Sequence, residues 1–196
     1  MISAILLGAG ESRRMGADKL SLLLGSKTVL ERSLEALIRS KVDEVVVVVR
    51  VEPPFWRGLG EGERVKLVFN PYHRHGMSSS IRCGLRALHG KAQGILIAMG
   101  DQPFLKAATI NALMRRFRPG ERMIVIPYCG GRKGHPVLFD RCYMTDLLRL
   151  RGDKGGRSII ERYPERVVPV RTRSEGVMKD LDTWKDYQKA CKMRVG

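Results

Sequence analysis

Short apolar segments that do not alternate with polar residues constrain the fold of this chain more than any other feature. Each is four to six residues long and rich in Val and Ile, and they lie at residues 2–7, 45–49, 65–69, 95–99 and 123–126. A strand with one solvent-exposed face alternates apolar and polar residues, whereas a strand covered on both faces does not. The five segments are therefore predicted to be strands of a sheet that is buried on both sides.

Helical patterns separate these strands. Apolar residues recur at three- and four-residue intervals over residues 29–38, 81–88 and 110–117, which places them on one face of a helix. Strands that alternate with helices of this length form right-handed βαβ units, and the resulting parallel sheet carries helices on both faces. The sequence thus predicts an α/β fold, a Rossmann-like three-layer αβα sandwich with a mostly parallel central sheet.

The last third of the chain is less regular. The expected elements there are a turn at 128–132, strands at 135–139 and 167–170, and helices at 140–150, 155–162 and 183–193. No internal repeat, low-complexity stretch or Pro/Ser/Gly-rich linker divides the sequence. Residues 1–196 are therefore expected to form a single domain.

The net charge indicates the kind of partner. Thirty-six Lys and Arg against 20 Asp and Glu give +16, which implies an anionic partner: a nucleic acid, a polyphosphate ligand or a membrane surface. Aromatic residues are only 6% and no nucleic-acid-binding motif is recognisable, so a nucleic acid is the disfavoured alternative. No apolar run approaches the ~20 residues of a membrane span, and no signal peptide is expected.

The four cysteines, at positions 83, 129, 142 and 191, have no C-x-x-C spacing, and no His-x-x-x-His accompanies them. A zinc site or a disulfide framework is therefore not expected. Reduced thiols are typical of the cytosol, so we expect a cytoplasmic protein.

A glycine-rich segment follows the first predicted strand, and ligands of an open parallel sheet bind at the carboxyl ends of its strands. Residues 7–19 read LGAGESRRMGADK. Consecutive backbone N–H groups in such a loop can form an anion-binding nest, to which Arg14 and Lys19 add positive charge. The segment matches neither the dinucleotide-binding fingerprint nor the Walker A loop. It is predicted to hold phosphates, and a flexible surface loop is the alternative.

Carboxylates at two places suit a magnesium ion. Asp101 follows the fourth predicted strand, and Mg²⁺ takes one or two carboxylates together with substrate phosphates. The alternative for Asp101 is a helix cap, although it stands four or five residues early for that role. Asp180 or Asp182 would supply the second carboxylate, and Asp182 or Thr183 would cap the last helix.

The segment after the third strand offers groups for a ribose or a base. Asn70, Gly76 and Ser80 lie in the stretch NPYHRHGMSSS at residues 70–80. The alternative for the serines is capping of the next helix. His73 and His75 are interpreted as solvated residues of a polar loop rather than as metal ligands.

Six motifs, in order, resemble those of the MobA-like nucleotidyltransferases. The glycine-rich loop resembles the signature L-x-A-G-x-S-x-R-M-G-x-x-K. The others are GMSSSI at 76–81, GDQP at 100–103, GHPVLF at 134–139, LRGDKGGR at 150–157 and DLDT at 180–183. Together they cover almost the whole chain, and MSSS, GDQP and GHPVLF are most similar to the molybdenum cofactor cytidylyltransferase branch.

The resemblance implies a fold like that of the nucleotide-diphospho-sugar transferases and an Mg²⁺-dependent reaction. CMP from CTP would be transferred to the phosphate of molybdopterin that carries molybdenum, with release of pyrophosphate. A molybdoenzyme that receives the finished cofactor is a candidate partner. Guanylyl transfer from GTP, or transfer to another phosphorylated small molecule, stays open because Gly8 departs from both L-A-A-G and L-A-G-G. Trp184 stands where the family usually has Pro.

The expected roles of the residues follow from these patterns and from the resemblance. The expected catalytic residues are Arg14, Lys19 and Asp101, and the expected metal ligands are Asp101 and Asp182. The expected nucleotide contacts are Leu7, Gly8, Ala9, Gly10, Ser12, Arg14, Met15, Gly16, Lys19, Asn70, Gly76, Ser80 and Asp101. The expected acceptor contacts are His135, Asp153 and Arg157; the alternatives are a turn residue for His135 and a solvated helix charge for Arg157.

Overall fold

The computed structural model describes residues 1–12, 14–51 and 64–193. Within these residues an eight-stranded sheet has the order β10-β7-β9-β6-β1-β4-β5, with β8 paired to β7. The strands are β1 (Ile2–Gly8), β4 (Glu44–Val49), β5 (Val65–Phe69), β6 (Gly94–Met99), β7 (Ile124–Cys129), β8 (Arg132–Lys133), β9 (Val137–Asp140) and β10 (Val167–Arg171). All seven strands predicted from the sequence are present. Six lie within two residues of their expected bounds, whereas β7 continues three residues beyond its expected end, into the turn expected at 128–132.

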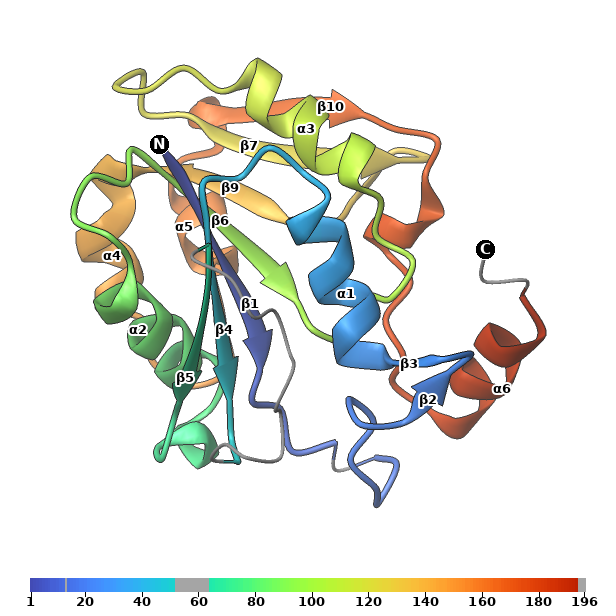
Figure 1. The fold of residues 1–196 in the computed structure, drawn as a ribbon. Coiled ribbons are helices and arrows are strands. Elements are labelled where there is room, and N and C mark those ends of the chain that lie inside the picture. The colour runs from blue at the N-terminus through green and yellow to red at the C-terminus, as the bar shows by residue number, and fades with distance from the viewer. Residues whose placement is uncertain (13, 52–63, 194–196) are drawn as a thin grey trace.

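Helices cover both faces of the sheet, as predicted (Figure 1). One face carries α1 (Val29–Ile38) and α3 (Ala107–Arg116). The other carries α2 (Met77–Ala87), α4 (Met144–Leu148) and α5 (Arg157–Arg162). The last helix, α6 (Trp184–Lys192), lies beside a short hairpin of β2 (Leu23–Leu24) and β3 (Lys27–Thr28) that the sequence did not predict.

Strand β4 explains why the apolar segments do not alternate. All six of its residues are buried. Val45, Val47 and Val49 pack in the core under α1 and α3, whereas Val46 and Val48 pack in the core under α2, α4 and α5. Because successive side chains of a strand point to opposite faces, two cores require apolar residues at every position.

The sheet is mostly parallel but mixed. The pairs β1–β4, β1–β6, β4–β5 and β7–β10 are parallel, whereas β9 is antiparallel to both β6 and β7. The helix expected at 140–150 is divided into a 3-10 turn, Arg141–Tyr143, and α4, because the Asp140 carboxylate accepts a hydrogen bond from the Cys142 N–H and starts the turn.

Two further observations concern the whole of the described chain. No helix in residues 1–12, 14–51 or 64–193 is long and apolar enough to cross a membrane. All four cysteines are free.

The loops that follow β1, β5 and β6 meet at one edge of the sheet, where the carboxyl ends of these parallel strands lie.

Candidate active site

A cavity of about 480 Å³ lies at this carboxyl edge. The glycine-rich loop after β1, the segment before α2, the end of β6 and the segment before α6 all contribute to it. Its lining consists of Leu7, Ala9, Gly10, Glu11, Ser12, Arg14, Lys19, Leu20, His73, Arg74, Gly76, Met77, Ser80, Met99, Asp101, Asp153, Asp180 and Asp182. Segments far apart in the sequence therefore meet where the α/β topology predicts a ligand.

The glycine-rich loop is shaped by a turn centred on Ser12. The Met15 N–H donates to the Ser12 carbonyl at 2.9 Å, and the Ser12 hydroxyl accepts from the Lys19 N–H at 3.2 Å. Ser12 and Gly16 both have left-handed backbone, with φ of 51° and 65°. A Cβ on Gly10 would meet no atom of the described residues within 4 Å, so this position faces open space.

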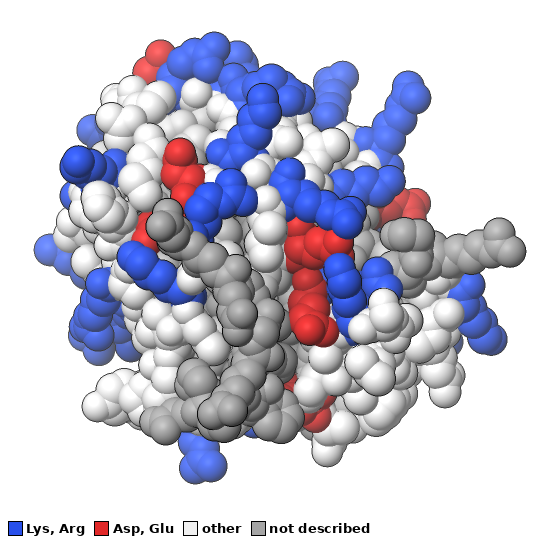
Figure 2. Space-filling view, viewed as in Figure 1, with Lys and Arg blue, Asp and Glu red and all other residues white. Residues whose placement is uncertain are grey.

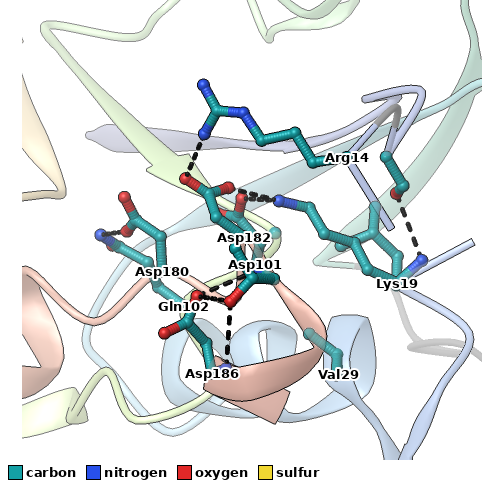
Figure 3. Close-up of polar contacts among 12 residues, drawn as sticks. Arg14, Lys19, Val29, Asp101, Gln102, Asp180, Asp182 and Asp186 are labelled. Atoms are coloured by element: carbon teal, nitrogen blue, oxygen red, sulfur yellow. Dashed lines mark hydrogen bonds and ion pairs between the residues drawn. The ribbon is translucent and has the colours of Figure 1, made fainter. Parts of the chain in front are cut away.

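A lysine and two aspartates form the polar centre of the cavity (Figure 3). The Lys19 Nζ lies 2.6 Å from Asp101 Oδ2 and 3.0 Å from Asp182 Oδ1. Arg14 Nη1 lies 3.3 Å from Asp182 Oδ2, and its side chain is 76% exposed. Burial alone would lower the pKa of Lys19, but Asp101 and Asp182 together raise it, so the ammonium carries its charge.

Asp180 is the third carboxylate of this cluster, and Gln102 holds it. Asp180 Oδ1 accepts from Gln102 Nε2 at 2.6 Å, and Gln102 Nε2 also lies 3.3 Å from the Val177 carbonyl. Burial raises the pKa of Asp180, and the negative charges of Asp101 and Asp182 add to the effect. Three carboxylates thus lie beside one half-buried lysine and the exposed Arg14, which leaves an excess of negative charge.

This cluster fits a divalent metal ion that also binds a ligand. Asp101 Oδ1 is buried and accepts no hydrogen bond from any residue that the structure describes. Asp182 lies on the other side of Lys19, whereas Asp180 is held by Gln102. Among the described residues no three His, Cys, Asp or Glu side chains are grouped closely enough to hold a metal by themselves. Two carboxylates completed by phosphate oxygens are the arrangement that Mg²⁺ commonly takes.

A second cavity, of about 330 Å³, shares Met77 and Met99 with the first. Apolar side chains of the α2 and α5 face line most of it, and the polar groups at its edge are Lys133, His135, Arg157 and Glu161. The His135 Nδ1 is buried and has no hydrogen-bond partner within the described part of the chain. Burial lowers the pKa of the imidazole, although the charge of Asp101 acts in the opposite direction.

The structure brings together most, but not all, of the residues predicted to bind the nucleotide. Gly8, Met15, Gly16 and Asn70 do not line either cavity. A Cβ on Gly8 would point into the core, 3.2 Å from Leu30 Cδ1. Asn70 is 1% exposed, and its Nδ2 donates to the hydroxyls of Ser79 and Ser80 at 2.9 and 3.0 Å, so it positions α2.

The residues predicted at the acceptor are divided between the two cavities. His135 and Arg157 line the second, whereas Asp153 lines the first and accepts from the Met77 N–H at 2.9 Å.

The serines at 78–80 do not cap α2 from outside. They lie within its first turn, and Gly76 precedes the helix. Thr183 caps α6, and Asp186 completes the capping box. Of the two caps expected for this helix, Asp182 and Thr183, the structure thus has Thr183.

Sequence reasoning missed several residues of the lining. His73, interpreted as solvated, has a side chain that is only 19% exposed, with Nε2 3.6 Å from Glu11 Oε1. Arg74, Met77 and Met99 also line the cavity. The signal available in the sequence was position, because each lies within three residues of a predicted site residue.

Residues 4–167 match the MobA-like NTP transferase domain. The chain belongs to the MobA-like family of nucleotidyltransferases. Membership implies an NTP substrate, a phosphorylated acceptor and a divalent metal. The chain is 29% identical to the nicotine blue oxidoreductase of Paenarthrobacter nicotinovorans over 190 residues, 93% of this chain and 92% of that protein. It is also 29% identical to the purine catabolism protein PucB of Bacillus subtilis over 192 residues, again 93% and 92%.

Other relatives carry different names. A probable molybdenum cofactor guanylyltransferase of Methanosarcina acetivorans is 34% identical over 120 residues, 58% of this chain and 52% of that protein. Among solved structures, a mycobacterial homologue of Rv0371c from strain JC1 superposes with a TM-score of 0.83 at 28% identity, covering 97% and 94% of the two chains. Rv0371c of Mycobacterium tuberculosis, solved with manganese, has a TM-score of 0.77 at 27% identity, covering 98% of each chain. The domain match shows the family. The names of the relatives differ from one another, so they do not show which nucleotide or which acceptor this chain uses.

Proposed function

We propose that the protein is an Mg²⁺-dependent cytidylyltransferase that moves CMP from CTP onto the phosphate of a molybdopterin-type acceptor. The observation that carries the proposal is the cluster of Lys19, Asp101 and Asp182 at the carboxyl edge of the sheet, beside a glycine-rich loop. Two anionic substrates must meet there, so positioning and fixed positive charge do most of the catalytic work.

The glycine-rich loop binds the triphosphate. Gly10 presents backbone without a side chain to the cavity, and Arg14 and Lys19 supply positive charge beside it. Gly76 and Ser80 line the opposite wall and contact the ribose and base. Asn70 acts through Ser80, whose hydroxyl it holds.

An oxygen of the acceptor phosphate attacks the α-phosphorus of CTP in line, one P–O bond forms, and the bond to pyrophosphate breaks. A phosphate oxygen is already ionised at neutral pH, so the chain needs no general base. Asp101 and Asp182 would hold the metal, with the unpartnered Asp101 Oδ1 as one ligand atom. The bound Mg²⁺ would neutralise charge on the transferring phosphoryl group. Lys19 and Arg14 stabilise the negative charge that pyrophosphate carries away.

The acceptor lies in the second cavity, which opens beside the first across Met77 and Met99. Its apolar walls suit a ring system, and Arg157 at its edge suits an anionic group. The neutral His135 imidazole offers the buried Nδ1 for a hydrogen bond to the ring. Asp153 lies between the nucleotide and the acceptor.

Ala9 supports CTP as the nucleotide. It is 4% exposed and lines the first cavity, so its methyl group occupies space that a larger purine ring would need. Gly8 does not enlarge this wall, because a side chain there would point toward Leu30. Guanylyl transfer is the second candidate, since several relatives are named guanylyltransferases. One steric feature supplies only ~1–3 kcal/mol of discrimination, so some use of GTP is expected.

The decisive experiment measures pyrophosphate release with each of the four NTPs, Mg²⁺ and a molybdopterin acceptor. The expected kcat/KM is higher for CTP than for GTP. Ala9→Gly is the matched variant and should erode the preference. A preference for GTP in the unmodified protein would replace cytidylyl by guanylyl transfer, and no release with any NTP would overturn the proposal.

A further inference from the structure

Helix α6 is joined to the glycine-rich loop through Trp184. The indole Nε1–H donates to the Met15 carbonyl at 3.0 Å, across 168 intervening residues of sequence. Met15 is itself tied to Ser12 by its N–H, so the carbonyl that Trp184 binds belongs to the turn that shapes the loop. Trp184 is the first residue of α6 and lies two residues after Asp182.

A second contact from α6 holds the far end of the segment 15–23, whose first residue is bound by Trp184. Tyr187, one turn along α6, donates its hydroxyl to the Leu23 carbonyl at 2.6 Å. The Trp184 and Tyr187 rings meet edge to face, with centroids 5.9 Å apart at 80°. Figure 1 shows α6 lying along the hairpin that begins at Leu23. Lys19 lies between the two anchored carbonyls, and its side chain reaches back to Asp182.

These contacts close a ring through the active site. It runs from Met15 along the loop to Lys19, across the ion pair to Asp182, through the α6 N-terminus to Trp184, and back to Met15. The Trp184 hydrogen bond therefore fixes the position of the Lys19 backbone relative to the Asp182 backbone. Trp184 is 45% exposed, so its ring is only partly buried and its N–H makes a specific bond to the loop.

We propose that Trp184 is a positioning residue that holds the phosphate-binding loop in register with Asp182. It touches neither substrate, and it acts by restraining Met15. The inference rests on the proposed function, because it needs this loop to bind a nucleotide. Trp184 stands where the family usually has Pro, and Pro has no side-chain N–H to donate. In this chain the indole N–H therefore joins the phosphate-binding loop to the segment that carries Asp182.

The test compares Trp184→Phe with the unmodified protein. Phe keeps an aromatic ring and removes the N–H. Trp184→Pro is the second variant, because Pro is accepted at the first position of a helix and the indole is lost. Tyr187→Phe is the matched control: it removes a hydrogen bond from the same helix to a carbonyl outside the phosphate-binding turn. The readouts are calorimetric CTP binding, KM for each substrate, kcat and Tm.

Both Trp184 variants should raise the Kd and KM for CTP about 5-fold to 10-fold, as loss of one hydrogen bond predicts, and leave the acceptor KM unchanged. Tyr187→Phe should change the CTP KM less than 2-fold.

Two results would overturn the inference. CTP binding unchanged in both Trp184 variants would show that the hydrogen bond has no part in positioning. A parallel loss of Tm and of affinity for both substrates, equal in Tyr187→Phe, would show that α6 only stabilises the fold. Absence of CTP binding in the unmodified protein would instead overturn the proposed function, and the inference with it.

Discussion

Lys19 is the residue on which most of the site depends, because it neutralises the two carboxylates that would otherwise repel each other. With Asp101 and Asp182 at 2.6 and 3.0 Å, its ammonium lies where the carboxylates converge. A divalent ion drawn to the same oxygens must compete with this charge. In the proposed site the loop lysine and the metal would share one set of oxygens, and a bound nucleotide would attract Lys19 toward its phosphates.

Lys19→Met should consequently tighten Mn²⁺ binding in the absence of nucleotide, by on the order of 10-fold, while weakening CTP binding. Electron paramagnetic resonance of free Mn²⁺ measures the first effect directly. Arg14→Met is the control, because it removes an equal charge whose side chain is 76% exposed and screened by water. Equal Mn²⁺ affinities in the unmodified protein and Lys19→Met would contradict the competition.

Asp101→Asn should lower kcat by on the order of 10² or more, because the amide cannot replace the charge that holds a metal and stabilises the transferring phosphoryl group. Mn²⁺ affinity should fall in parallel. The fold should survive, since Asp101 stands just after the end of β6 and not within a core. Circular dichroism checks the fold, and a variant that turns over at the normal rate would remove Asp101 from the site.

At the scale of elements, Glu44 at the start of β4 ties three strands and a loop together. Its carboxylate accepts from Ser3 Oγ at 2.8 Å, from Lys66 Nζ at 2.8 Å and from the His89 N–H at 3.0 Å. Burial alone would raise the pKa of Glu44, but Lys66, His89 and Ser3 together hold it below its ordinary value. The charged form therefore stabilises the folded state.

Glu44→Gln should reduce the free energy of unfolding at pH 7 by about 1.5–3 kcal/mol, the usual range for hydrogen bonds to a charged group. Because the folded pKa lies below the unfolded one, this stabilisation is present above pH ~4.3 and is lost as the pH falls through the folded pKa. Urea unfolding at a series of pH values from 7 downward should show the difference between the two proteins narrowing once the pH falls below ~4.3. A difference that persists unchanged at pH 3.5 would contradict this assignment.

The elements also differ in how far the sequence predicts them. The five Val residues of β4 face two cores, so their pattern alone predicts a central buried strand. The direction of β9 has no such local signal, because an antiparallel strand between β6 and β7 is equally apolar on both faces. The two-residue strands β2 and β3 are too short to produce any period.

The residues of the candidate site also differ in how far the sequence predicts their positions. Asp101 and the glycine-rich loop were predictable because each follows a buried strand, and parallel strands bring such loops together. The inward orientation of Asn70 and the bond from Trp184 to Met15 were not, since they depend on packing between segments that share no sequence signal.

At the scale of the whole molecule, positive charge is in excess. Figure 2 shows lysines and arginines spread over much of one face, with fewer acidic side chains among them. The net charge of +16 attracts a nucleotide from a distance, whereas Arg14 and Lys19 act at contact range. The long-range attraction between the protein and the nucleotide should weaken as salt is added, because the Debye length falls from about 10 Å at 0.1 M to about 3 Å at 1 M.

Raising NaCl from 50 to 500 mM should therefore lower kcat/KM for CTP by roughly 10-fold, mainly through KM, because screening weakens attraction between the protein and the free nucleotide. The value of kcat should change less, since the buried contacts of Lys19 and Asp101 are screened less than exposed charges. Lys185→Gln, a change at an exposed lysine outside both cavities, should reduce the salt dependence only slightly, whereas Arg14→Gln should reduce it clearly. Steady-state kinetics at five salt concentrations measure these slopes, and a kcat/KM independent of salt would mean that the surplus charge has no part in capturing the nucleotide.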